Sequence, residues 1–211
     1  MKNIFNLIIV IFSVTTLFSQ PSEQYLKGMG QAMALWGEGK PMEASALFER
    51  IALAEKDNWI PSYYAANTLI VNAFVTEDKS QINEMLEKAK TFIEQAHERS
   101  PDNSEIVTLE GLLYTGYVVM DPQTYGMTMS PKIMALHEKA VALDANNPRA
   151  HTNLIGYEIG SAQFFGTDLS TFCDRLKAVI PLYDKQPQDY PFAPHYGMDR
   201  IKESMAQCGC E

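Results

Sequence analysis

The sequence predicts an all-α fold, a right-handed solenoid of about four antiparallel helix pairs with an atypical capping pair at the carboxyl end. Three observations predict it. A helical segment that ends in a turn rich in Asn and Asp recurs at residues 44–58, 89–103 and 133–148. Gly and Pro fall between the periodic segments, and no segment alternates as a strand would. Because one helix pair cannot bury its apolar face alone, recurring pairs are expected to stack.

The first pair is expected over residues 22–37 and from Pro41 to about Lys56. Proline is tolerated there because the first turn of a helix does not need its N–H. Asn58 is the expected cap of the third helix, with Pro61 still in the first turn.

Ser80 is the expected cap of a helix that runs to about Arg99. The dipeptides Ser130–Pro131 and Asn147–Pro148 each combine a capping residue with proline, so they are expected to open two further helices. Residues 121–130 then form the longest predicted loop. The remaining helices are expected over residues 104–119, 131–143, 148–164, 168–183 and 196–207. Asp168 is the expected cap of the helix over residues 168–183.

The amino end predicts an export signal. Lys2 gives a positive start, residues 4–17 are mostly apolar, and polar sequence begins at Ser19. The apolar stretch is shorter than the ~20 residues of a membrane span, which favours a signal peptide over residues 1–19 rather than an uncleaved anchor. Residues 20–211 are expected to form a single domain, since no linker interrupts them. Its repeat-like units are expected at residues 25–56, 59–101, 104–145 and 148–185, with a cap helix at 196–207.

The formal net charge of −9 at pH 7 limits the partners. Nucleic acid needs Lys and Arg to neutralise its phosphates, and anionic lipid attracts the same residues, so neither partner is expected. We therefore expect an exported protein with no stable membrane insertion after signal removal. The periplasm is the favoured compartment, and secretion or association with the outer membrane are the alternatives.

Aligning the pairs brings similar residues into register. The second helices align Ala44, Ala89 and Ile133, then Phe48, Ile93 and His137, then Ile51, Ala96 and Ala140, while the first helices align Ala32, Ala66, Gly111 and Gly156. This pattern resembles the tetratricopeptide repeat. The units here are about 45 residues apart rather than about 34, and Lys56 and Ala145 replace the turn proline of that repeat. The resemblance implies stacked helix pairs and no particular ligand.

The chain also resembles a group of small exported repeat proteins of Bacteroidetes-type bacteria. The residues that carry this resemblance are Met120–Pro122, Tyr125–Gly126, Asn146–Ala150, Phe164–Gly166, Tyr196–Gly197 and Cys208. The resemblance implies an exported helical-repeat protein without an assigned activity.

Histidines and cysteines are the residues that would carry metal or redox chemistry. His97, His137, His151 and His195 include no pair at helical spacing, so no metal site is predicted, and the repeat register turns His137 inward. Three cysteines in an exported chain predict one disulfide, between Cys173 and either Cys208 or Cys210. A redox or metal role for Cys208 and Cys210 is the competing hypothesis. No nucleophile or phosphate-binding motif is present, so neither an enzyme nor a cofactor is predicted.

Aromatic and Met side chains on the first helices predict a groove on the concave face. Its residues are expected to be Met33, Trp36, Tyr63, Asn67, Ile70, Leu112, Asn153 and Tyr157. This mixture of apolar area and polar groups suits a protein or peptide partner. The main hypothesis is thus a non-catalytic protein- or peptide-binding module of the cell envelope. The alternative is a small-molecule or glycan-handling envelope protein that uses the 121–130 loop as a lid.

Overall fold

A computed structural model describes residues 21–186 and 190–210 of the chain. Within this part every regular element is helical, with nine α-helices, two short 3-10 helices and no strand. The predicted all-α fold class is therefore confirmed. The predicted signal peptide, residues 1–19, lies outside the described residues. None of the helices in the described part is long and apolar enough to cross a bilayer.

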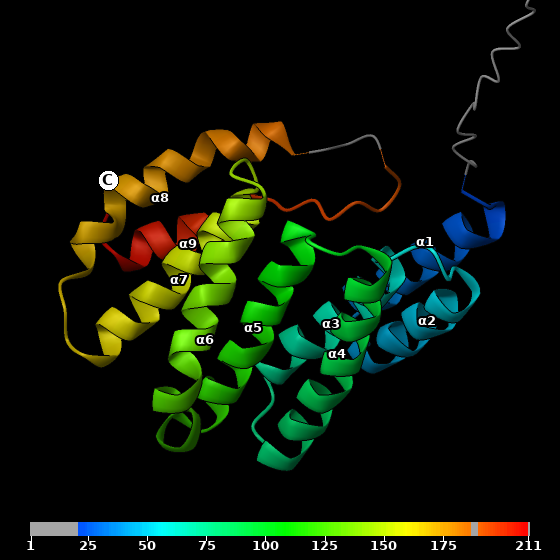
Figure 1. Ribbon diagram of the computed structural model, residues 1–211, viewed down its shortest axis with the longest axis horizontal. Helices are drawn as coiled ribbons and strands as arrows, with labels where there is room; N and C mark the ends of the chain where they lie inside the picture. The colour runs from blue at the N-terminus through cyan, green and yellow to red at the C-terminus, as the bar shows by residue number, and fades with distance from the viewer. Residues whose placement is uncertain (1–20, 187–189, 211) are drawn as a thin grey trace, which may run out of the picture.

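The first seven helices run up and down in chain order, and each packs against the next (Figure 1). Their bounds are α1 Glu23–Gly37, α2 Pro41–Ala54, α3 Ile60–Ala73, α4 Lys79–Arg99, α5 Ser104–Met120, α6 Pro122–Leu143 and α7 Pro148–Phe164. Helix α5 also contacts both α3 and α7, so these odd-numbered helices form one layer. The paired arrangement follows from helices that each present an apolar stripe to a neighbour.

Side-chain caps set most of the helix starts. Ser22 Oγ accepts a hydrogen bond from the Tyr25 N–H (3.0 Å), and Asn147 Oδ1 accepts one from the Arg149 N–H (2.9 Å), as the sequence predicts for α7. The prediction for α4 was wrong by two residues. Asp78 is its cap and accepts from the Ser80 N–H at 2.8 Å, so Ser80 already lies inside the helix.

The predicted loop at residues 121–130 is also wrong, because the structure is helical there. Helix α6 begins at Pro122 and continues through Pro131. Asp121 caps it by accepting from the Thr124 N–H (3.2 Å), which leaves Ser130 without a capping role. Pro131 removes the backbone donor to the Met127 carbonyl, and beside it the Ser130 hydroxyl donates to the Gly126 carbonyl. Residues 121–130 thus form no loop that could serve as a lid.

The carboxyl end differs from the single helix predicted over residues 168–183. It contains the 3-10 helix η1 (Leu169–Phe172), α8 (Cys173–Val179) and a second 3-10 helix, η2 (Ile180–Lys185), which has Pro181 in its first turn. The last helix, α9, spans Asp199–Gln207 and starts later than residue 196. Gln186 holds the backbone of residue 196 outside the helix, because its Oε1 accepts from the Tyr196 N–H (2.9 Å) and its Nε2 donates to the Tyr196 carbonyl (2.9 Å).

The core divides into two main clusters. The larger one joins α1 to α5, and the smaller one joins α7, α8, η2 and α9. Of the aligned small residues, Ala32 and Ala66 are fully buried, as expected for close helix packing. A Cβ at Gly111 would lie 2.5 Å from the His137 ring, so this position also requires its small residue. Gly156 has open space beside it, and the close approach predicted there is absent.

Candidate ligand-binding site

Residues 190–198, called here the crossing segment, precede α9 and run across the amino ends of the odd helices (Figure 1). The Phe192 ring meets the Tyr25 ring of α1 edge-on, with centroids 5.9 Å apart. Further along the segment, the Tyr196 hydroxyl is hydrogen-bonded to the Tyr63 hydroxyl of α3. The protein's own chain therefore occupies the amino-terminal part of the face on which a groove is predicted.

The eight predicted groove residues fall into two groups. Tyr63, Asn67, Ile70 and Asn153 are buried, and Met33, Trp36, Leu112 and Tyr157 are half-buried. The half-buried residues also have protein partners. Trp36 packs edge-on against Tyr64, and the Tyr157 hydroxyl donates to Ser130 Oγ at 2.8 Å. Contact of a ligand with this set stays a prediction, and in this conformation at most the half-buried members offer surface to one.

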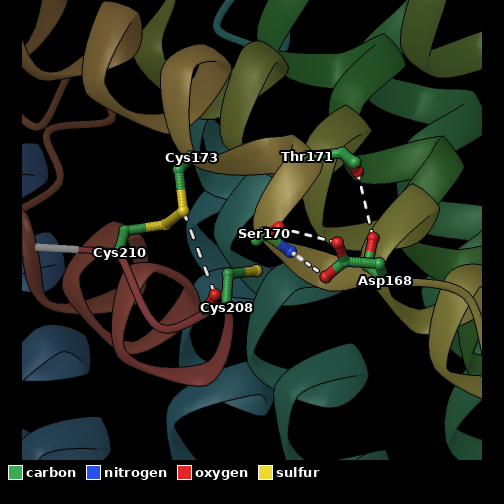
Figure 2. Close-up of a disulfide and its surroundings, with 6 residues drawn as sticks. All are labelled: Asp168, Ser170, Thr171, Cys173, Cys208 and Cys210. Carbon is green, nitrogen blue, oxygen red and sulfur yellow. Dashed lines mark hydrogen bonds between the residues drawn. A yellow bond between two sulfur atoms is a disulfide. The ribbon is translucent and has the colours of Figure 1, made fainter.

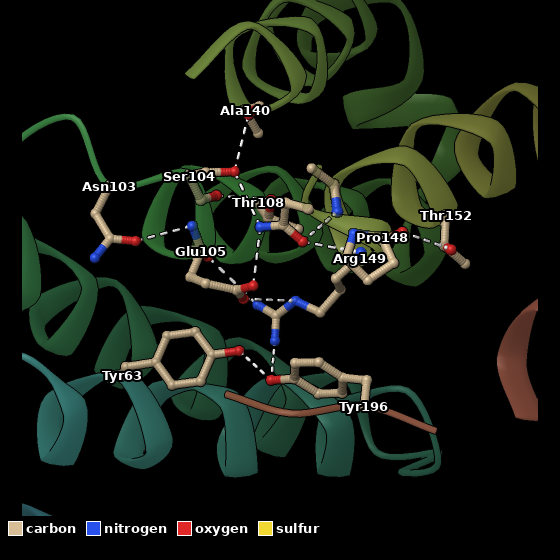
Figure 3. A network of polar contacts seen from close by, with 12 residues as sticks. Tyr63, Asn103, Ser104, Glu105, Thr108, Ala140, Pro148, Arg149, Thr152 and Tyr196 are labelled. Carbon is tan, nitrogen blue, oxygen red and sulfur yellow. Dashed lines mark hydrogen bonds and ion pairs between the residues drawn. The ribbon is translucent and has the colours of Figure 1, made fainter. Parts of the chain in front are cut away.

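Arg149 holds the crossing segment in place (Figure 3). Its guanidinium lies 4.9 Å from the centroid of the Tyr63 ring and 4.4 Å from that of Tyr196. It donates to the Tyr196 hydroxyl and to the Glu105 carbonyl, and its Nε lies 3.2 Å from the Glu105 carboxylate. Sequence reasoning missed this cluster because its members come from helices α3, α5 and α7 and from the distant crossing segment.

Burial acts on the charges of this cluster in opposite directions. It raises the pKa of the Glu105 carboxyl, an effect that the hydrogen bond from the Asn147 amide opposes. It lowers the pKa of the Arg149 guanidinium, an effect that Tyr196 opposes. A guanidinium keeps its proton even so, which makes the adjacent Glu105 carboxylate its counterion. These groups face one another and link α3, α5 and α7 to the crossing segment, so the cluster holds these elements together.

The disulfide joins Cys173 at the start of α8 to Cys210 after α9 (Figure 2). Of the two pairings that the sequence leaves open, the structure thus has the second. Cys208 keeps a free, buried thiol, and burial raises the pKa of that thiol, which disfavours the reactive thiolate. No group of three or more His, Cys, Asp and Glu side chains in the described residues is arranged to hold a metal ion.

His137 is buried, as the repeat register predicts, and 1% of its surface is exposed. Its Nδ1 has no hydrogen-bond partner within the described part of the chain. Burial lowers the pKa of His137 from 6.5 to about 4. The folded protein therefore holds this imidazole in its neutral form down to an unusually low pH.

This burial predicts an acid-sensitive fold. Because the unfolded chain takes up the His137 proton first, stability that is present above pH 6.5 is lost as the pH falls toward 4, by up to about 3 kcal/mol. Replacing His137 by leucine is expected to flatten this part of the stability curve, as measured by urea unfolding between pH 4 and 7. Replacing the exposed His195 by leucine is the control and should leave the slope unchanged. An unaltered slope in the His137→Leu protein would contradict the prediction.

Apolar side chains are exposed at the carboxyl ends of α3, α5 and α7, which lie opposite the ends that the crossing segment covers. Three pairs of residues form this surface, called here the apolar edge: Phe74–Val75, Val119–Met120 and Phe164–Phe165. Five of these side chains are exposed, and Met120 is half-buried against the core. Each pair follows the previous one by about 45 residues, the repeat period, and stands where α3, α5 or α7 ends. Figure 1 places these three helix ends along its lower side, away from the crossing segment.

The exposure of the apolar edge is unusual for such large side chains. Val75, Phe164 and Phe165 are 76–79% exposed, and Val119 is 59% exposed. Scattered exposed apolar residues are normal, but a row that recurs with the repeat indicates a binding surface. Sequence reasoning missed this row. The row can be found by extending the alignment of Ala66, Gly111 and Gly156 to the ends of the helices that contain them.

A cavity of about 200 Å³ opens between two pairs of the apolar edge. It lies where the end of α3, the start of α4 and the end of α5 meet. Its lining residues are Ala73, Phe74, Thr76, Glu77, Lys79, Ile82, Gly116, Val119 and Met120. Apolar walls with a few polar groups at the rim are typical of small-molecule sites.

A larger depression of about 520 Å³ lies elsewhere, and it is a weaker candidate. Its lining is mostly charged: Leu53, Lys56, Asp57, Glu98 and Arg99. The Arg99 guanidinium already donates to Ser62 Oγ (2.7 Å) and to the Ala52 carbonyl (3.1 Å), so it is not free to bind an anion. We therefore place the candidate site at the apolar edge.

Comparisons with known proteins concern the fold. No family model and no curated protein sequence matches this chain. A solved structure of the HusA haemophore from Porphyromonas gingivalis matches with a TM-score of 0.76 and 21% identity, over 89% of this chain and 95% of that one. Part of MamA from Desulfovibrio magneticus RS-1 matches with a TM-score of 0.32 and 16% identity, over 79% of this chain and 99% of that one. The first likeness shows that this chain has the helical fold of the HusA haemophore.

Proposed function

We propose that this protein is a non-catalytic carrier of a small, flat, apolar ligand of the porphyrin class, which it binds at the apolar edge. The observation that carries the proposal is the row of exposed apolar pairs with a cavity between two of them. The shared fold with HusA, which its name describes as a haemophore, supports the ligand class. This function corresponds to the small-molecule hypothesis more closely than to the peptide-binding one.

The energetics of the apolar edge suit a flat ligand. The cavity of about 200 Å³ is too small to enclose a macrocycle, but it can take one of its edges while the exposed side chains cover a face. Covering on the order of 200 Å² of apolar surface would contribute about 5 kcal/mol, before the cost of immobilising the ligand. Met120 adds a polarisable thioether to the wall, a group that adapts to aromatic surfaces.

The cell envelope is the proposed location. The Cys173–Cys210 disulfide supports it, because such bonds persist in oxidising compartments. A carrier outside the cytoplasm would also agree with the export signal expected at residues 1–19.

Binding of haemin tests the proposal. Titration of the mature protein with haemin, followed by absorbance, is expected to show saturable binding. The Val119→Asp substitution is expected to weaken it by about tenfold or more, because it places a charge beside the cavity without touching the core. Met42, which is 53% exposed on α2, provides the matched control, and Met42→Asp should bind as the unmodified protein does.

Two outcomes would overturn the proposal. One is the absence of saturable binding to the unmodified protein, and the other is equal affinity of the Val119→Asp and unmodified proteins. Circular dichroism of each variant checks that the fold is intact.

Protein or peptide binding is the second candidate function. The observation that favours it is the crossing segment itself, because the odd helices hold a non-helical stretch of chain through Tyr25, Tyr63 and Arg149. In this conformation those positions are already filled, so a partner peptide would have to displace residues 190–198. The peptide function predicts no saturable haemin binding, and the titration above separates the two.

A further inference from the structure

We infer that Lys79 makes the apolar edge selective for ligands that carry a carboxylate on the rim of an apolar body. The inference rests on the proposed function and adds the ligand's charge to it. It assigns Lys79 as a residue that determines specificity, in the lining of the cavity between α3, α4 and α5.

The charges that line this cavity are few. Of its nine lining residues, Lys79 is the one cation and Glu77 the one anion. The remaining walls are apolar or small, apart from Thr76. A ligand seated against Phe74 and Val119 would therefore have its polar substituents near Lys79 or in water.

The position of Lys79 is unfavourable for the fold by itself. It is the first residue of α4, where the positive end of the helix dipole repels a cation. Lys79 also takes part in none of the ion pairs found among the described residues. A cation that neither the helix nor an ion pair requires is available to a ligand.

The acidic neighbours of Lys79 explain why one cation matters here. Asp78 is engaged as the cap of α4, and Glu77 stands on the cavity wall. Asp121 caps α6, and its pKa is lowered mainly by hydrogen bonds from Thr124, with a smaller contribution from Lys79. Without Lys79, a ligand carboxylate would meet only negative groups on a chain of net charge −9. Lys79 offsets this repulsion as the one cation among the residues that line the cavity.

The test compares two probes with the same macrocycle, protoporphyrin IX and its dimethyl ester, in which methyl esters replace the two charged carboxylates. Each is titrated into the unmodified protein and into the Lys79→Gln variant, with quenching of protein fluorescence as the readout. Lys79→Gln is expected to weaken the free acid by about tenfold and to change the diester by less than about twofold. Added salt should weaken the free acid in the unmodified protein and have little effect on the diester.

Lys90, an exposed cation on the same helix, provides the matched control. Lys90→Gln should bind both probes as the unmodified protein does. If Lys79→Gln alters both probes equally, or neither, the inference is wrong while the proposed function stands. If neither probe binds to the unmodified protein, the proposed function fails and the inference fails with it.

Discussion

Replacing Arg149 by methionine is expected to lower the free energy of unfolding by about 3–5 kcal/mol. The Arg149 side chain is 9% exposed, and its Nε lies 3.2 Å from the Glu105 carboxylate. The substitution would leave the Glu105 carboxyl buried without a counterion, where it must either stay charged in an apolar site or take up a proton. It would also remove the cation that lies against the rings of Tyr63 and Tyr196. Urea unfolding of the two proteins at pH 7 gives the difference directly.

Two further variants distinguish a buried counterion from a general effect of removing an arginine. Arg175 pairs with Glu158 at the surface, where its side chain is 45% exposed, so Arg175→Met is expected to cost less than about 1 kcal/mol. Adding Glu105→Leu to Arg149→Met should restore most of the lost stability, because it removes the orphaned charge. If the double variant is less stable than Arg149→Met alone, the explanation by an unpaired carboxylate is wrong.

Replacing Cys210 by serine is expected to lower the free energy of unfolding by about 4 kcal/mol. The Cys173–Cys210 bond closes a loop with a sequence separation of 37 residues, which includes the crossing segment. Opening the loop increases the entropy of the unfolded chain and also frees the carboxyl anchor of the segment that covers α1, α3 and α7. The measurement is urea unfolding with and without a reductant.

The free thiol of Cys208 provides the control for this experiment. Cys208→Ala keeps the disulfide and should retain the response to reductant, while Cys210→Ser should lose it. The reverse result would mean that Cys208 is the partner of Cys173. Unchanged stability of the unmodified protein in reductant would show that the disulfide does not stabilise the fold.

The helix boundaries show how far local signals reach. Asn147 before Pro148 predicts the start of α7 correctly, because a cap and its target N–H are neighbours in the chain. The same logic failed at Ser130–Pro131. There the competing cap at Asp121 starts α6 earlier, and Tyr125 and Met129 pack on the core and keep that segment helical. Tertiary packing decided which of two local signals prevailed.

The repeat register alone does not reliably predict which face of a helix stays open to a ligand. The register turned His137 inward correctly, because that choice depends only on the helix and its neighbours. It assigned Tyr63 to an open groove, but Tyr63 is fully buried, since α3 is covered by its neighbours and its amino end meets Tyr196 of the crossing segment. The crossing segment begins with a turn at residues 190–193 and continues without regular structure, and it has no periodic signature in the sequence.

The sequence by itself determined the helical class, the succession of helices up to α7 and the one-disulfide framework around Cys173. These properties depend on spacing, capping and composition, which are local. The tertiary structure alone decided that Cys210 is the disulfide partner, that Arg149 meets Glu105 and Tyr196, and that the exposed apolar pairs lie along one edge. Each of these features brings together residues distant in the chain, and their approach is fixed by how the helices pack rather than by any single segment.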